Sequence, residues 1–196
     1  MAVLLSGKGS NFVALADACA RGEVPAEIVL VVSNRPDAPG LVRARERGIA
    51  AKVIPTRGRP RAEQERDLVA ALEQAQAEWI CLAGYMRLLS AEFVARFPGR
   101  ILNIHPALLP AFPGLEAQRQ AWEYGAKVSG CTVHLVDAGC DTGPIVMQRA
   151  VPVLDDDTPE TLAARILEQE HIAYAAALRQ LLTRPYVIAQ RRVVFG

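Results

Sequence analysis

Short apolar segments alternate with segments of helical pattern through the first half of the chain. The strands that we expect there cover residues 1–6, 27–33, 52–54, 79–83 and 101–105. The helices expected between them cover residues 11–20, 38–47, 61–76 and 91–97. Strands that are apolar on both faces and alternate with helices indicate a parallel sheet covered on both sides. We therefore predict an α/β fold with a doubly wound, mostly parallel, Rossmann-like sheet.

The pattern changes in the second half of the chain. The elements expected there are a helix over 118–124, strands over 130–136 and 145–153, a helix over 159–182 and a last strand over 187–194. The first two of these strands are expected to pair antiparallel at the edge of the sheet. Thr158 followed by Pro159 is typical of a helix start. No linker interrupts the sequence, so we predict a single domain over residues 1–196.

The composition limits the classes of function. Hydrophobic residues make up 51% of the chain, and the formal net charge of +1 disfavours a broad surface for nucleic acid or membrane. No apolar run reaches the roughly 18 residues of a transmembrane helix, and no signal peptide is recognised. The four cysteines form no C-x-x-C pair, and no histidine has zinc-ligand spacing from them. We expect a soluble, cytoplasmic protein with free thiols and no metal.

Asn103 and His105 stand at the end of a predicted buried strand, immediately before Pro106. Side chains alternate along a strand, so these two face the same way. Open α/β sheets bind ligands beyond the carboxyl ends of their strands. An amide donor beside an imidazole at that point suits a developing oxyanion and a proton transfer. The alternative is that each is a capping or hydrogen-bonded structural residue.

The first turn between a strand and a helix reads Ser-Gly-Lys-Gly-Ser-Asn over residues 6–11. Glycines let the backbone approach an anion, and the free N–H groups of a helix start point towards it. The turn lacks the third glycine of the dinucleotide fingerprint and the Gly-Lys-Ser/Thr of a Walker loop. We therefore expect Gly9, Ser10 and Asn11 to bind a single phosphate monoester. The alternative is a tight turn that binds nothing.

Asp141 lies in a glycine-bracketed loop, residues 137–144, between the two antiparallel strands. A carboxylate near His105 would favour the imidazolium and raise the pKa of the ring from its usual value of about 6.5. The alternative role of starting an Asx turn fits Asp137 better than Asp141.

Glu170 falls on the apolar face of the long predicted helix. A carboxylate there is costly unless it is paired or turned into a polar pocket. We expect it to bind either an arginine, as a structural feature, or a ligand hydroxyl or amine.

The segment Gly-Tyr-Met-Arg-Leu-Leu, residues 84–89, follows the fourth predicted strand. An apolar loop with one arginine could receive a flat heterocycle with an acidic tail. The alternative is that its methionine and leucines belong to the core.

Taken together, these segments resemble the folate-dependent formyltransferase family, and in particular its phosphoribosylglycinamide formyltransferases. The matching segments occur in the family's order and cover residues 6–11, 83–89, 103–110, 130–134, 141–144 and 169–171. Asn-x-His-Pro together with Asp-x-Gly-Pro is shared by formyltetrahydrofolate-using enzymes broadly. The Ser-Gly-x-Gly-Ser-Asn opening narrows the resemblance to the glycinamide ribonucleotide branch, with its Rossmann-like formyltransferase fold.

The resemblance implies transfer of a formyl group from the co-substrate 10-formyltetrahydrofolate to the amine of glycinamide ribonucleotide, in the purine pathway to IMP. It implies that residues 1–100 bind the phosphate and ribonucleotide, and that residues 101–196 are the catalytic and folate-binding half. The catalytic residues that it implies are Asn103, His105 and Asp141, and those for the ribonucleotide are Gly9, Ser10, Asn11 and Glu170. Those for the folate are Arg61, Met86, Arg87, Leu88, Leu89 and Asn103. We expect no metal, and a monomer or a homodimer.

For the reaction, we expect the unprotonated amine to attack the formyl carbon and give a tetrahedral oxyanion. Asn103 and the imidazolium of His105 would stabilise this charge by hydrogen bonds. Asp141 would raise the pKa of His105 and help to move the proton from the amine to the leaving nitrogen.

Three rival functions share part of this pattern. Formyltetrahydrofolate hydrolase has the same Asn, His and Asp but usually an extra N-terminal regulatory domain, whereas this chain begins at its first predicted strand. Methionyl-tRNA formyltransferase needs a C-terminal RNA-binding domain and a basic surface, neither of which we expect here. The third rival is a non-catalytic nucleotide- or folate-binding module that keeps only the fold.

Overall fold

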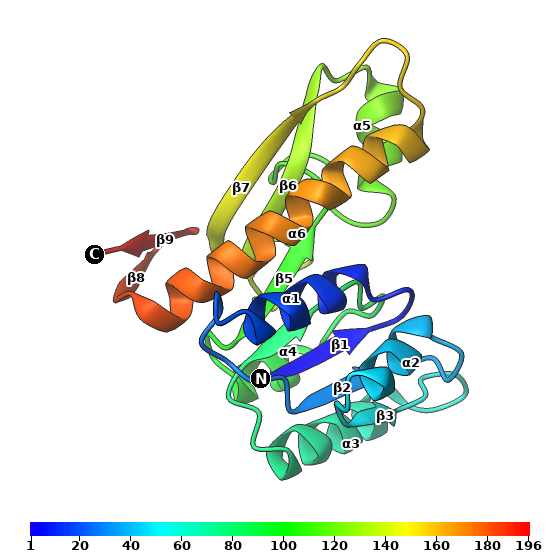
Figure 1. The fold of residues 1–196 in the computed structure, drawn as a ribbon, viewed down its shortest axis with the longest axis vertical. Coiled ribbons are helices and arrows are strands. Elements are labelled where there is room, and N and C mark those ends of the chain that lie inside the picture. Colours follow the sequence, from blue (N-terminus) through cyan, green and yellow to red (C-terminus); the bar gives the residue numbers. More distant parts are fainter. The chain divides into compact units, whose positions relative to one another are not determined.

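The structure is a computed structural model that describes residues 1–196 (Figure 1). The chain forms two compact units, Met1–Leu102 and Asn103–Gly196. The boundary between them falls inside one strand, β5 (Ile101–His105). None of the helices combines the length and the apolar character needed to cross a membrane.

The first unit is built on parallel strands. They are β1 (Ala2–Leu5), β2 (Leu30–Ser33), β3 (Ala51–Val53) and β4 (Ile80–Leu82), in the order β3-β2-β1-β4. All pairings among them are parallel. Every residue of β1, β2 and β4 is buried, which explains why these strands read as continuous apolar runs. The predicted α/β fold with a mostly parallel sheet is confirmed.

Three helices connect these strands, and a fourth follows β4. They are α1 (Ser10–Ala20), α2 (Pro39–Glu46), α3 (Arg61–Gln74) and, after β4, α4 (Ala91–Arg96); Figure 1 shows them around β1, β2 and β3. The sharp entry into α1 depends on Gly9, whose φ of 71° is in the left-handed region that glycine adopts without strain. The turn after β1 therefore brings the start of α1 to the carboxyl end of that strand.

The second unit carries the antiparallel pair that the sequence predicts. β6 (Val128–Leu135) pairs antiparallel with β7 (Ile145–Pro152). The long helix α6 (Pro159–Thr183) lies along both strands, and α5 (Ala117–Tyr124) packs against α6 (Figure 1). The face that α6 buries includes Ile166, Ala173 and Tyr174, which matches the apolar stripe of the sequence.

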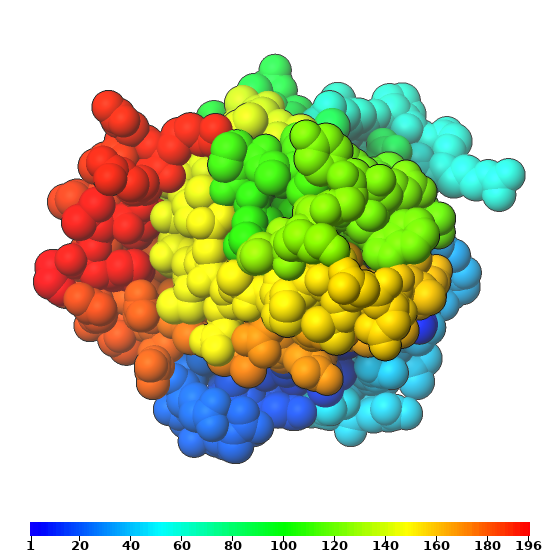
Figure 2. All heavy atoms as spheres, turned by 90° about the horizontal axis from the view of Figure 1, so that it is seen from above, coloured from blue at the N-terminus to red at the C-terminus, as the bar shows by residue number.

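The prediction of one last strand over residues 187–194 is wrong. The segment forms a hairpin of β8 (Tyr186–Ala189) and β9 (Arg192–Phe195), which pair antiparallel. Its turn places Gln190 at a φ of 55°, a conformation usually signalled by glycine or asparagine. β9 lies next to the start of β7, where the N–H of Ile145 donates to the carbonyl oxygen of Arg191 at 2.8 Å. Figure 2 shows the hairpin, in red, lying against the yellow β7.

Asp157 fixes the start of α6. Its two carboxylate oxygens accept hydrogen bonds from the guanidinium of Arg165 at 2.6 and 2.8 Å. The N–H of Leu154 and the hydroxyl of Thr161 also donate to it, at 2.7 and 2.8 Å. The hydrogen bond with Arg165 is the main cause that holds the pKa of Asp157 well below its ordinary value of 3.8. One carboxylate thus joins the preceding loop to the first two turns of the helix.

Replacing Asp157 with asparagine should lower the melting temperature at neutral pH by several degrees, because the charge-assisted pair with Arg165 is lost. The pKa of Asp157 is lower in the folded than in the unfolded state. Its contribution to stability is therefore complete above about pH 4 and is lost as the pH falls further. The difference in melting temperature between Asp157→Asn and the wild type should accordingly shrink in acid, as thermal unfolding followed by circular dichroism would measure.

The matched control is Asp155→Asn. The Asp155 side chain is 90% exposed and pairs with Lys127 at the surface, where such pairs contribute little. Equal losses in the two variants would contradict the role given to Asp157.

Candidate active site

The end of β5 presents Asn103 and His105 on one face of the strand, as alternation requires. His105 is only 4% exposed, and Asn103 is half-buried. Nε2 of His105 lies 2.8 Å from the carbonyl oxygen of Phe112. A carbonyl only accepts hydrogen bonds, so Nε2 carries a proton and donates it to Phe112. The other ring nitrogen, Nδ1, is the one that faces a carboxylate.

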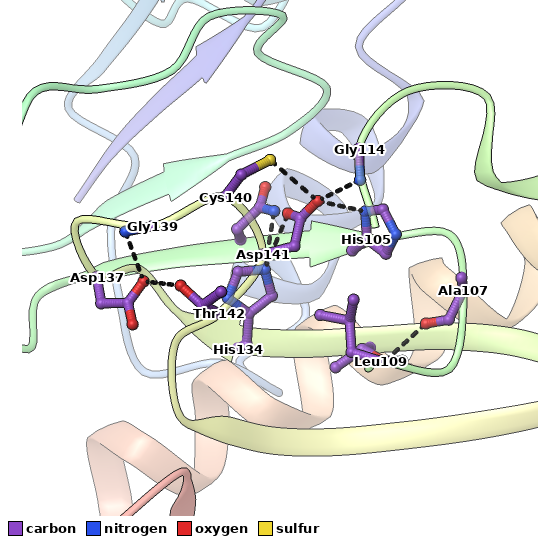
Figure 3. Close-up of polar contacts among 12 residues, drawn as sticks. His105, Ala107, Leu109, Gly114, His134, Asp137, Gly139, Cys140, Asp141 and Thr142 are labelled. Atoms are coloured by element: carbon purple, nitrogen blue, oxygen red, sulfur yellow. Dashed lines mark hydrogen bonds and ion pairs between the residues drawn. The ribbon is translucent and has the colours of Figure 1, made fainter. Parts of the chain in front are cut away.

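That carboxylate belongs to Asp141. Its Oδ2 atom lies 3.4 Å from Nδ1 of His105 and accepts a hydrogen bond from the N–H of Gly114 at 2.8 Å (Figure 3). The side chain of Asp141 is 13% exposed. The structure therefore brings the carboxylate to the imidazole, at the end of a strand.

The environment keeps Asp141 ionised. Burial is the largest single influence and favours the neutral acid. The contacts with His134 and with the N–H of Gly114 outweigh it, together with the charge that His105 carries at the acid pH where Asp141 titrates. The result is a pKa of about 2 for Asp141, below its ordinary 3.8. Asp141 is thus a fixed negative charge at neutral pH.

The expectation that Asp141 raises the pKa of His105 above its ordinary value is wrong in its net direction. Burial is the strongest influence on the ring and lowers its pKa below 6.5. The hydrogen bond to the Phe112 carbonyl and the charge of Asp141 both raise it, as expected for Asp141, but by less. The resting ring is therefore neutral at neutral pH, with its proton on Nε2.

His134 is a further member of this cluster, to which the sequence prediction gave no role. Its Nε2 lies 3.1 Å from Nδ2 of Asn103 and 3.6 Å from Oδ1 of Asp141. Its Nδ1 is 3.0 Å from the carbonyl oxygen of Leu135. With the proton on Nδ1, Nε2 accepts a hydrogen bond from the Asn103 amide. His134 is 2% exposed. The sequence signal that could have identified it is a single histidine in a strand of otherwise apolar and small residues.

The loop over residues 137–144 sets the direction of the Asp141 side chain. Asp141 has a φ of 55°, in the left-handed region. Asp137 starts the turn, as predicted: its Oδ1 accepts from the N–H of Gly139 at 3.0 Å and from the hydroxyl of Thr142 at 2.6 Å (Figure 3). The loop is therefore braced by its own hydrogen bonds.

Gly9, Ser10 and Asn11 lie in the first unit, at the turn from β1 into α1. They border a cavity of about 400 Å³. Its lining residues are Ser6, Gly7, Lys8, Gly9, Ser10, Asn11, Asn34, Arg35, Ala83, Gly84 and Met86. The first N–H groups of a helix have no partner within the helix and attract an anion. The cavity therefore has the size and the donors for a phosphate group.

The predicted folate residues of the first unit lie around one segment, residues 84–89. Met86 and Leu88 are 60% and 65% exposed, so they are not core residues. Arg61 donates to the carbonyl oxygen of Leu88 at 2.8 Å and pairs with Glu65 at 3.0 Å. The structure thus brings Arg61 to this segment.

Glu170 lies in the second unit, on the buried face of α6, and is 6% exposed. Burial raises the pKa of the Cys131 thiol to about 12, and the negative charge of Glu170 adds to this effect. Residues assigned to the ribonucleotide therefore occur in both units. All four cysteines are free, and no group of three or more His, Cys, Asp or Glu side chains is placed to hold a metal ion.

Known proteins with similar sequences include formyltransferases and purine biosynthetic proteins. A sequence model described as "Formyl transferase" matches residues 1–178. The phosphoribosylglycinamide formyltransferase of Escherichia coli is 42% identical over 173 residues, 88% of this chain and 82% of that protein. The trifunctional purine biosynthetic protein adenosine-3 of Drosophila melanogaster is 48% identical over 96% of this chain, which spans only 14% of that relative's length.

Solved structures agree with the sequence matches. Glycinamide ribonucleotide transformylase 1 from Symbiobacterium toebii is 50% identical, with a TM-score of 0.96 over 99% of this chain and 92% of that one. A formyltetrahydrofolate deformylase from Burkholderia mallei is 31% identical, with a TM-score of 0.90 over 100% of this chain and 69% of that one. The resemblance drawn from the motifs is confirmed: the chain belongs to the formyl transferase family.

Proposed function

We propose that this chain transfers the formyl group of 10-formyltetrahydrofolate to the amine of glycinamide ribonucleotide, giving formylglycinamide ribonucleotide in de novo purine biosynthesis. The observation that carries the proposal is the approach of Asp141 to His105, at 3.4 Å, beside Asn103. Membership of the formyl transferase family and relatives named for this reaction support it. We assign the reaction to the cytoplasm and the active species to a monomer or a homodimer.

The oxyanion is assigned to Asn103 and His105. The amine nitrogen bonds to the formyl carbon, and the carbonyl oxygen takes up the negative charge. The Asn103 amide has two N–H donors, of which one is directed at His134 at 3.1 Å, and we assign the other to the oxyanion. Such a donor contributes a factor of typically about 10²–10³ in rate.

The proton transfers are assigned to Asp141 and His105. Once bonded to the formyl carbon, the amine becomes acidic, and the ionised Asp141 accepts its proton directly or through water. Sharing of this proton with Nδ1 of His105 makes the ring an imidazolium whose charge Asp141 offsets. Its Nδ1–H, the ring donor that Phe112 does not occupy, is assigned to the oxyanion. The proton passes to the leaving nitrogen of the folate as its bond to the formyl carbon breaks. Atoms and charge balance without a further reactant.

The remaining site residues are assigned to binding. Gly9, Ser10 and Asn11 would hold the phosphate of the ribonucleotide, and Glu170 would accept a hydrogen bond from its hydroxyl or amine groups. The residues assigned to the folate are Arg61, Met86, Arg87, Leu88, Leu89 and Asn103. The exposed apolar side chains of this set suit a flat ring, and its arginines suit the acidic tail.

The second candidate function is hydrolysis of 10-formyltetrahydrofolate, in which water takes the place of the amine. The similarity to the Burkholderia mallei deformylase supports hydrolysis as the second candidate. The cavity beside residues 9–11 has no part in that reaction.

Release of tetrahydrofolate, followed by absorbance, tests the proposed function directly. We expect it only when glycinamide ribonucleotide is present, because the amine is the nucleophile. Release at the same rate without the ribonucleotide would establish the hydrolase. Binding of both substrates with no release would indicate a module without catalysis.

Replacing His105 with alanine should abolish transfer while glycinamide ribonucleotide still binds, because the ribonucleotide is assigned to residues 9–11 and Glu170. Turnover and titration calorimetry measure the two effects separately. Loss of ribonucleotide binding in a folded variant would contradict the role given to His105.

Replacing Asp141 with asparagine should slow transfer by about 10²–10³-fold, because the proton acceptor and the counter-charge are both lost. It should also lower the pKa of His105 further below 6.5, since the carboxylate is one of the influences that raise it. The chain has three histidines, so an NMR titration can follow each ring. His171, whose pKa is lowered by burial alone, is the internal control, and an unchanged pKa at His105 would refute the pairing.

A further inference from the structure

One buried hydroxyl, that of Ser6, joins three segments around the cavity of the first unit. Ser6 follows β1 directly and is 4% exposed. Its Oγ accepts a hydrogen bond from the N–H of Met86 at 2.8 Å and donates one to Oδ1 of Asn34 at 2.6 Å. Its own N–H donates to the carbonyl oxygen of Gly84 at 3.0 Å. All four residues line the cavity of about 400 Å³.

These hydrogen bonds set the orientation of the Asn34 amide. A hydroxyl has a single proton, and in the structure Ser6 donates it to Oδ1 of Asn34 while its oxygen accepts from the Met86 N–H. The oxygen end of the amide is therefore fixed on Ser6, and the NH₂ end is turned away from it. No side chain or carbonyl of the protein accepts a hydrogen bond from this NH₂ group, which leaves two donors on the wall of the cavity.

The other groups near Asn34 do not take over this role. The guanidinium of Arg35 is held by Asp37 through two hydrogen bonds, at 3.2 and 2.9 Å. The Lys8 side chain is exposed. Asn34 is thus the side chain on this wall whose donors are both oriented and unoccupied.

We propose that Asn34 is a further binding residue for the phosphate of the ribonucleotide, in the cavity that it lines together with residues 9–11, and that Ser6 is the residue that positions it. The inference rests on the proposed function and deepens it, since it names a residue that selects the phosphorylated substrate. Neutral amide donors to a charged phosphate form strong hydrogen bonds without bringing a second charge into the cavity.

The same hydroxyl connects this wall to the segment of residues 84–89. Because Ser6 also holds the N–H of Met86, loss of the hydroxyl releases both the Asn34 amide and the backbone of a segment assigned to the folate. Changes at Ser6 therefore act on both substrates, whereas changes at Asn34 act on the ribonucleotide alone.

The main test is Asn34→Asp, with calorimetric titration of glycinamide ribonucleotide and of the folate into the free enzyme. Aspartate keeps the oxygen that accepts from Ser6 but replaces the donors with a carboxylate oxygen that repels phosphate. We expect ribonucleotide binding to weaken by about 10-fold to 100-fold, the effect of losing a hydrogen bond to a charged group. Folate binding and the melting temperature should not change.

Arg35→Gln is the matched control, because it alters the charge beside the same cavity by the same amount. Its guanidinium is already engaged by Asp37, so we expect a change in ribonucleotide binding of less than about threefold. Ser6→Ala should weaken binding of both substrates.

The outcomes separate the two proposals. A wild type that binds no ribonucleotide overturns the proposed function and with it the role of Asn34. A wild type that binds, with Asn34→Asp binding equally well or Arg35→Gln losing as much, overturns the role of Asn34 alone. An effect of Ser6→Ala on only one substrate overturns the positioning role of Ser6.

Discussion

The arrangement of the candidate active site depends on the carboxylate of Asp141. It contacts His105 through Oδ2 at 3.4 Å and His134 through Oδ1 at 3.6 Å, and the N–H of Gly114 donates to it at 2.8 Å. One buried negative charge therefore joins the end of β5, the end of β6 and the turn that precedes α5. Without these partners a buried carboxylate would take up a proton. The hydrogen bond from Gly114 and the contact with His134 thus both orient the carboxylate and help to keep it ionised.

The depth of this site accounts for the state of His105. Removing the ring from water disfavours its charged form more than one neighbouring carboxylate favours it. In the proposed reaction, a ring that is neutral at rest but lies next to a permanent negative charge needs only a proton from the amine to become a charged donor. Under this proposal the positive charge on the ring forms together with the oxyanion, and no reorganisation of solvent is required.

Most of the fold could be predicted because its signals are local. β1, β2 and β4 are buried on both faces and read as apolar runs, and Gly9 marks the turn into α1. The C-terminal hairpin could not be predicted, because its turn uses Gln190 where glycine or asparagine would have signalled it.

The site could be predicted in part. Asn103 and His105 follow from strand alternation, and Asp141 from its loop and from the family's motifs; the roles of all three stay predictions. His134 was missed because its contacts with Asn103 and Asp141 join separate segments of the chain. The net direction of the His105 pKa was wrong because burial depends on packing by the whole fold, which no local pattern reports.

The C-terminal hairpin lies beyond residue 178, where the match to the family ends. Its turn nevertheless contacts the loop that carries Asp141. The carbonyl oxygen of Arg191 accepts from the N–H of Ile145 at 2.8 Å, and the Arg191 guanidinium donates to the carbonyl oxygen of Asp141 at 3.5 Å. Fraying of β8 and β9 would therefore remove a hydrogen bond from the backbone of Asp141. A tag or fused partner attached at Gly196 therefore has to leave β8 and β9 paired if the Asp141 carboxylate is to keep its orientation.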